Sequence, residues 1–212
     1  MGGNDGGSGA RVRRELAGLR VTATSVDGLL TATAGYLGDL IGLHVDARVY
    51  RDRDAEALAR RVLDTARTAA ERAARAAGEV ADGFGDGDLL FGPSLHALDR
   101  LIARERVTAA SGSRPVLRSG IDHEAERRAL VARREAADVI RETAESDDGL
   151  VAATADVRGR LLDLSLHQAI HRWPDSRRLA DAIVATTRRA AERARARLNA
   201  TTTAPVARQG LS

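Results

Sequence analysis

The sequence predicts an α+β protein built from two similar units in tandem. Residues 26–76 align with residues 147–197 at a constant offset of 121 without a gap, and twenty of the 51 aligned pairs are identical. The most informative identities form short motifs, above all Asp-Gly-Leu at residues 27–29 and 148–150. Solenoid arrays use shorter repeats and need about three or more of them. Two copies with this long period therefore indicate a duplicated small domain.

Three antiparallel strands are predicted in each copy. In the first copy, residues 21–24 alternate and are rich in β-branched side chains, Asp27 and Gly28 form the dipeptide best suited to a two-residue hairpin turn, and residues 29–36 continue the alternation. Residues 40–50 are expected to form a third strand. Its apolar face comprises Ile41, Leu43 and Val45, and the aligned face in the second copy comprises Leu162, Leu164 and Leu166. One apolar and one mixed face predict an antiparallel sheet that is covered on one side only.

A long amphipathic helix is predicted after the third strand of each copy. Asp54 and Asp175 are suitable N-cap residues, and a stripe at helical spacing follows each of them. The stripe comprises Leu58, Val62, Thr65, Ala69 and Ala73 in the first copy and Leu179, Ile183, Thr186, Ala190 and Ala194 in the second. The helices are expected at residues 54–77 and 175–199, which is longer than strands of roughly 20 Å can cover. Their C-terminal halves should therefore project.

A further helix is predicted before the strands, at residues 121–144 in the second copy and, in a shorter form, at residues 11–19 in the first. The expected organisation is a first unit at 10–77, a linker at 78–119 with a short helix near 94–107, a second unit at 120–200, and flexible termini at 1–9 and 201–212. A unit of this size buries only about 60% of its unfolded surface. The two copies should therefore pair, either within one chain or between chains.

Composition excludes several kinds of chemistry. The chain has no Cys, and its 33 basic residues are all Arg, which excludes disulfides, thiolate nucleophiles, a P-loop lysine and a Schiff-base lysine. His167 and His171 lie four residues apart without a third ligand, so neither a metal site nor a cofactor is expected. No window approaches the ~18 apolar residues of a membrane span, and the Gly-rich N-terminus does not resemble a signal peptide. A soluble, cytoplasmic protein without membrane contact is expected.

The order of predicted elements, with Asp-Gly-Leu opening the second strand and Leu-x-Leu on the third, resembles the YbaB/EbfC family of nucleoid-associated DNA-binding proteins. The resemblance is similar in both copies and is closest to actinobacterial members. It is carried by the segments SVDGLLTATAGYLGDLIGLHVDARVYRDRDAEALARRVL and SDDGLVAATADVRGRLLDLSLHQAIHRWPDSRRLADAIV, each followed by an Ala/Arg helix. With those helices it covers about two thirds of the chain.

This resemblance implies a non-enzymatic protein of the nucleoid. Members of the family are homodimers whose helices extend like tweezers and bind duplex DNA with little sequence preference. By analogy, the two copies here would form one intramolecular pseudo-dimer. The family has no defining catalytic motif, and this chain also lacks the Gly-x-Ser-x-Gly motif of a serine hydrolase. The expected partners are duplex DNA and the protein itself.

Arg residues on the two long helices are the candidate DNA contacts. The second copy supplies Arg188, Arg189, Arg193, Arg195 and Arg197, and the first copy supplies Arg60, Arg61, Arg67, Arg72 and Arg75. Arg binds phosphate oxygens through a planar fork without contacting any base. The Arg residues of the first copy are interspersed with Asp64 and Glu71, so that copy is expected to bind DNA more weakly. Arg near a helix C-terminus also complements the helix dipole, which is the purely structural alternative.

A second function remains open from the sequence. The formal net charge is only +3, which also suits a protein-interaction module of the same fold that has lost DNA binding. Only two Phe, two Tyr and one Trp are present, which argues against binding single strands by base stacking. Replacing Arg188, Arg189 and Arg193 would separate the two functions, because only DNA binding depends on those side chains.

Overall fold

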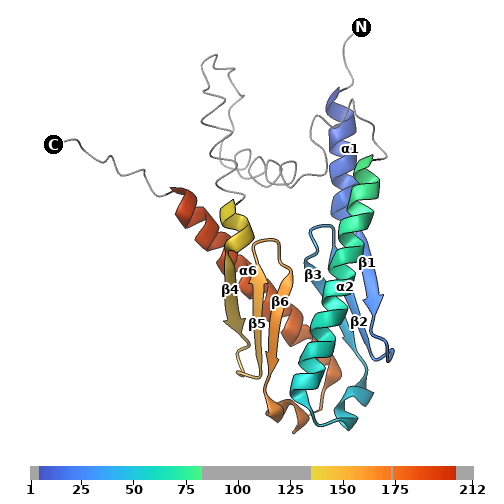
Figure 1. Ribbon diagram of the computed structural model, residues 1–212, viewed down its shortest axis with the longest axis vertical. Helices are drawn as coiled ribbons and strands as arrows, with labels where there is room; N and C mark the ends of the chain where they lie inside the picture. Colours follow the sequence, from blue (N-terminus) through green and yellow to red (C-terminus); the bar gives the residue numbers. More distant parts are fainter. Residues whose placement is uncertain (1–4, 83–134, 173, 204–212) are drawn as a thin grey trace, which may run out of the picture.

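A computed structural model describes residues 5–82, 135–172 and 174–203, which form two three-stranded antiparallel sheets, each followed by a long helix (Figure 1). The predicted α+β fold with two tandem units is confirmed. The predicted linker helix near residues 94–107 lies outside the described residues. Of the helix predicted at residues 121–144, residues 135–139 are helical, whereas residues 141–144 are a strand and not a helix, because they pair with the next strand as residues 20–23 do.

The elements occur in the same order in both units. The first unit comprises α1 (Asp5–Gly18), β1 (Arg20–Thr24), β2 (Leu30–Gly35), β3 (Leu40–Val45), the short 3-10 helix η1 (Ala47–Arg51) and α2 (Ala55–Asp82). The described part of the second unit comprises β4 (Arg141–Glu145), β5 (Val151–Asp156), β6 (Leu161–Leu166), the 3-10 helix η2 (Gln168–His171) and α6 (Ser176–Thr203). Asp54 caps α2, because its carboxylate accepts from the amide of Ala57 at 2.9 Å, and Asp175 caps α6 in the same way.

The first hairpin is longer than the predicted two-residue turn. The amide of Ser25 donates to the carbonyl of Leu30 at 2.9 Å, so residues 26–29 form a four-residue loop. Gly28 adopts φ +71°, and its equivalent Gly149 adopts φ +67°, a region that glycine enters at little cost. The predicted two-residue turn is wrong because the Asp27 carboxylate accepts the amide of Leu29 at 3.0 Å and thereby closes the wider loop.

The third strand departs from strict alternation. Thr33 pairs with Gly42 and Ala34 pairs with Leu40, so Ile41 is the extra residue of a β-bulge. Leu40 is consequently buried, whereas Ile41 is only half-buried, contrary to the predicted apolar face. The second unit repeats the bulge at its equivalent residue, Leu162. The strand also ends at Val45, not at residue 50, because Asp46 accepts the amide of Arg48 and starts the 3-10 helix η1.

The two units share one core. Helix α2 packs on β1 and β2 of its own sheet and on β6 of the other sheet, while α6 packs on β4, β5 and β3. The third strand of each unit therefore lies against the helix of the other unit. A single cluster of buried residues includes Leu30 and Leu58 from the first unit and Leu164 and Ile183 from the second. The two copies thus pair within one chain.

A pseudo-two-fold axis relates the units. Tyr50 and His171 occupy equivalent positions, and their rings meet edge to face with centroids 5.9 Å apart. Residues at equivalent positions can contact each other only close to such an axis. At the opposite end of the sheets, α2 and α6 continue past the strands, and α1 lies beside the projecting part of α2 (Figure 1). The predicted projection of both long helices agrees with this arrangement.

Candidate nucleic-acid interface

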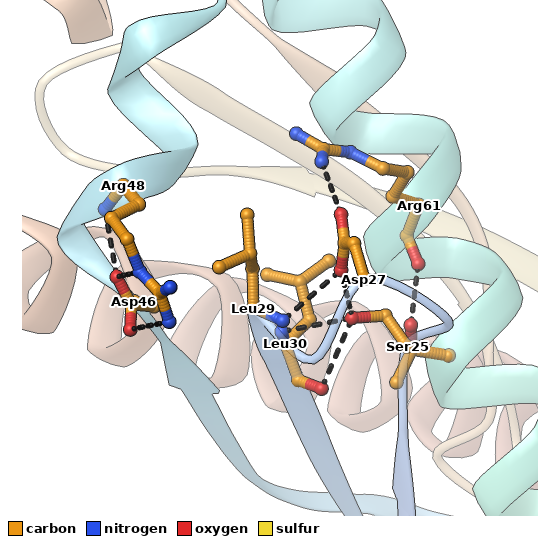
Figure 2. A network of polar contacts seen from close by, with 8 residues as sticks. Ser25, Asp27, Leu29, Leu30, Asp46, Arg48 and Arg61 are labelled. Carbon is orange, nitrogen blue, oxygen red and sulfur yellow. Dashed lines mark hydrogen bonds and ion pairs between the residues drawn. The ribbon is translucent and has the colours of Figure 1, made fainter.

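The Asp-Gly-Leu motif ties each hairpin to a long helix. Asp27 accepts the Ser25 hydroxyl at 2.6 Å through one carboxylate oxygen, and its other oxygen pairs with Arg61 of α2 at 2.5 Å (Figure 2). In the second unit Asp148 accepts the Ser146 hydroxyl at 2.7 Å and pairs with Arg178 of α6 at 3.1 Å. Arg61, one of the predicted DNA contacts, is therefore held against the hairpin.

Acid is expected to weaken the fold through these carboxylates. The Ser25 hydroxyl, the Leu29 amide and the Arg61 guanidinium lower the pKa of Asp27 below its ordinary 3.8, and the Ser146 hydroxyl, the Leu150 amide and the Arg178 guanidinium lower the pKa of Asp148. A lowered folded pKa gives stability that is complete above about pH 4 and is lost as the pH falls through the lowered values. Thermal melts between about pH 5 and pH 2.5 should show a steeper loss for the wild type than for an Asp27→Asn/Asp148→Asn variant. Parallel curves would contradict this prediction.

Two of the predicted Arg contacts occupy equivalent positions and cover the sheet edges. Arg72 donates through Nη1 to the carbonyl of Thr22 on β1 at 3.2 Å, and Arg193 donates to the carbonyl of Thr143 on β4 at 2.8 Å. Strands β1 and β4 are edge strands, whose outward carbonyls would otherwise face solvent. Both Arg side chains remain exposed. Since a guanidinium has five N–H donors, each can still offer donors to an anion.

Two further Arg side chains of α6 form ion pairs that the first unit lacks. Arg189 pairs with Asp147 at 2.8 Å and also donates to the carbonyl of Glu145, and Arg197 pairs with Glu142 at 2.6 Å. The equivalent positions in the first unit pair Thr68 with Val26 and Ala76 with Val21, all uncharged. The Arg cluster of the second unit is therefore partly neutralised by acids of its own sheet and hairpin, which the linear sequence did not reveal.

The remaining predicted contacts are dispersed. Arg60 and Arg67 are exposed on α2 and pair with Glu56 and with Asp64, the latter at 3.8 Å. Arg75 and Arg188 are exposed and form no hydrogen bond or ion pair with another described residue. Arg195 is half-buried, donates to the carbonyl of Val157 at 2.9 Å and lies beside Gly159, which touches Asp39 of the first unit. The structure therefore does not gather the ten predicted Arg side chains on one surface.

Sequence reasoning missed one pair of cations. Arg20 and Arg141 lie at equivalent positions as the first residues of the edge strands β1 and β4, and both are exposed. Each precedes by two residues the Thr whose carbonyl accepts Arg72 or Arg193. Extending the repeat alignment a few residues towards the N-terminus would have revealed them. Each edge strand therefore combines a strand Arg with a helix Arg, and we call these four residues the edge arginines.

Both units match a known family. Residues 8–88 and residues 124–210 match the YbaB/EbfC DNA-binding family. The chain belongs to this family. Nucleoid-associated proteins of Rhodococcus jostii (strain RHA1) and Rhodococcus opacus (strain B4) are each 37% identical over 81 residues, covering 36% of this chain and 72% of theirs. A nucleoid-associated protein of Rhodococcus erythropolis (strain PR4 / NBRC 100887) is 35% identical over 79 residues. No solved structure gives a significant match.

The described residues of the YbaB-like units meet the requirements of neither a three-ligand metal site nor a membrane-spanning helix. In the part of the chain that the structure describes, no three His, Cys, Asp or Glu side chains are grouped so that they could hold a metal ion. His167, at which the sequence predicted no metal site, accepts the amide of Ala169 through Nδ1 at 3.1 Å and caps η2. No helix among the described residues is long and apolar enough to cross a bilayer.

Proposed function

We propose that this chain is a non-enzymatic protein of the bacterial nucleoid that binds duplex DNA with little sequence selectivity. The observation that carries the proposal is the match of both units to a DNA-binding family, together with edge arginines that occur at equivalent positions on both units. A duplex has its own two-fold symmetry, so two related cationic surfaces suit two stretches of phosphate backbone. Proteins of Rhodococcus with similar units are nucleoid-associated.

The edge arginines Arg20, Arg72, Arg141 and Arg193, with the exposed helix residues Arg67, Arg75 and Arg188, are the proposed phosphate contacts. Arg72 and Arg193 each use one N–H on a strand carbonyl, which fixes the side chain while its other donors remain available. A guanidinium held in this way loses less freedom on binding than a free one. Phosphate contacts of this kind position a protein on DNA without specifying sequence.

The proposal predicts a steep salt dependence. Releasing counterions gives a log-log slope of about −0.9 for each phosphate that the protein neutralises. Titrating a labelled random-sequence duplex with the protein by fluorescence anisotropy, at several salt concentrations, should give saturable binding with a slope of roughly −4 or steeper. A duplex of different sequence should bind about equally well. A flat salt dependence, or no binding at low salt, would contradict the proposal.

A protein-interaction module is the second candidate. The ion pairs of Arg189 and Arg197 with acids of the second unit's own sheet and hairpin favour it, because they neutralise part of the cationic helix α6. Under this alternative the anisotropy titration gives no binding, and exposed Arg residues can be replaced without functional loss. The first unit favours DNA instead, since β1 carries Arg20 and no acidic residue beside Arg72.

A further inference from the structure

Equivalent positions carry unlike side chains where the two units meet. At the offset of 121, Gly35 corresponds to Asp156, Asp39 corresponds to Arg160, and Ala74 corresponds to Arg195. Four of these residues belong to the turns that join β2 to β3 and β5 to β6, or border them, and the other two belong to α2 and α6. These six positions therefore distinguish the first unit from the second at their interface.

The two turns touch across the pseudo-axis at their glycines. The amide of Leu40 donates to the carbonyl of Gly159 at 3.2 Å. A Cβ atom placed on Gly159 would lie 3.0 Å from Cβ of Asp39 and 3.5 Å from Nη2 of Arg195, so there is no room for a larger residue there. The Asp39 turn of the first unit therefore lies close to the Arg195 guanidinium of the second.

The other half of the interface has the opposite composition. A Cβ atom placed on Gly38 would lie 3.2 Å from Cβ of Ala70 on α2 and 3.2 Å from Cδ of Arg160. The position on α2 that corresponds to Arg195 is Ala74. At one contact, the turn that carries Asp39 therefore lies beside the Arg195 guanidinium. At the other contact, the turn that carries Arg160 lies beside alanine residues of α2.

Each turn also places a carboxylate in its own way. Asp156 is buried and accepts the amides of Arg158 at 2.9 Å and Arg160 at 3.0 Å, as well as Nε of Arg160 at 2.6 Å. In the first unit the equivalent residue is Gly35, and Oδ1 of Asp39 occupies the space that a Cβ atom of residue 35 would need. A carboxylate can therefore come from one position or from the other, but not from both.

We propose that these six positions make the interface selective for unlike units. The turn of the second unit carries Arg158 and Arg160 against one Asp156. Two units of the second type would place this cationic turn beside an Arg195 guanidinium at both contacts, and like charges repel. Two units of the first type would place alanine, and no Arg195 guanidinium, beside both Asp39 turns. Oδ1 of Asp39 is already buried without a hydrogen bond, so a nearby cation matters for its free energy. The surface of the first unit therefore fits the second unit and disfavours another copy of itself.

Exchanging the two sets tests this selectivity in the full chain. One variant, Gly35→Asp/Asp39→Arg/Ala74→Arg, gives both units the second set. Another, Asp156→Gly/Arg160→Asp/Arg195→Ala, gives both units the first set. Each is expected to lower the Tm by about 3–8 °C or to prevent folding. The combined variant with all six substitutions restores an unlike pair and should melt within about 2 °C of the wild type.

Three results would overturn the proposal. One is that the three-residue variants melt like the wild type. Another is that the Tm of the combined variant falls by as much as the Tm losses of the two three-residue variants added together, because the substitutions would then act locally and not through pairing. The third is that the combined variant does not fold. Light scattering should report the mass of one chain for the wild type and the combined variant alike. The test does not depend on DNA binding.

Discussion

Replacing Arg67, Arg72, Arg188 and Arg193 with Ala is expected to weaken binding to random-sequence duplex by about 100-fold, if three of the four contact phosphates at roughly 1 kcal/mol each. The four form two equivalent pairs, so both units lose the same charge. The log-log salt slope should become shallower by about 0.9 for each phosphate that is no longer neutralised. Fluorescence anisotropy at fixed low salt measures the change in affinity. A loss of affinity that depends strongly on the sequence of the duplex would contradict the prediction.

A matched control accompanies this variant. Arg51 and Arg172 are also exposed and equivalent, but they end or cap the 3-10 helices, which lie at the opposite end of the sheets from the projecting helix ends (Figure 1). Replacing Arg51 and Arg172 with Ala should leave the affinity for DNA within about twofold of the wild type, because the proposed phosphate contacts do not lie at that end of the sheets. Arg72→Lys/Arg193→Lys keeps the charge and should retain most of the affinity. If the control pair weakens binding as much per Arg removed as the four-residue variant does, net charge alone and not a defined surface binds DNA.

Replacing Leu58 with Ala should destabilise the whole chain by about 2–5 kcal/mol. Leu58 is fully buried, and its equivalent Leu179 is also buried in the same core cluster. Because that cluster includes residues of both units, either substitution should shift one cooperative transition and should not melt one unit alone. Differential scanning calorimetry and far-UV circular dichroism should report the same midpoint.

Exposed residues provide the control for this second prediction. Val26, at the tip of the first hairpin, is fully exposed, so Val26→Ala should change the free energy of unfolding by less than about 0.5 kcal/mol. Two separate transitions in Leu58→Ala, with the second at the wild-type temperature, would show that the units fold independently. Such a result would contradict the shared core.

The fold was predictable because its signals are local and occur twice. Asp-Gly-Leu, the N-cap residues Asp54 and Asp175, and the Leu58 stripe each specify structure within a few residues. The bulge at Ile41 was missed because Leu40 and Ile41 are both apolar, so the sequence pattern is equally compatible with either side chain facing the core. The four-residue hairpin loop was missed because the Asp27 side chain, and not a backbone carbonyl, accepts the amide of Leu29. The preference of Asp-Gly for two-residue turns does not include this side-chain hydrogen bond.

The candidate site was less predictable, because it depends on which residues face each other across the sheet and the helix. Glu142 and Asp147 lie 55 and 42 residues before their partners Arg197 and Arg189 in the chain, so no window of sequence shows the neutralisation. Arg195 belongs to the run of α6 cations in sequence, yet it lies beside the turn at Gly159 that touches the first unit. Comparing equivalent positions of the two copies was more informative than local charge.

The packing of α2 on β6 and of α6 on β3 has a consequence for assembly in the cell. Proteins that pair as separate chains lose their active form on dilution, because pairing depends on concentration. Here the partner of each unit is covalently attached, and its effective concentration is set by the connecting segment and not by expression level. The pair therefore persists at low copy number. Each half can also acquire mutations that a symmetric dimer would have to accept twice.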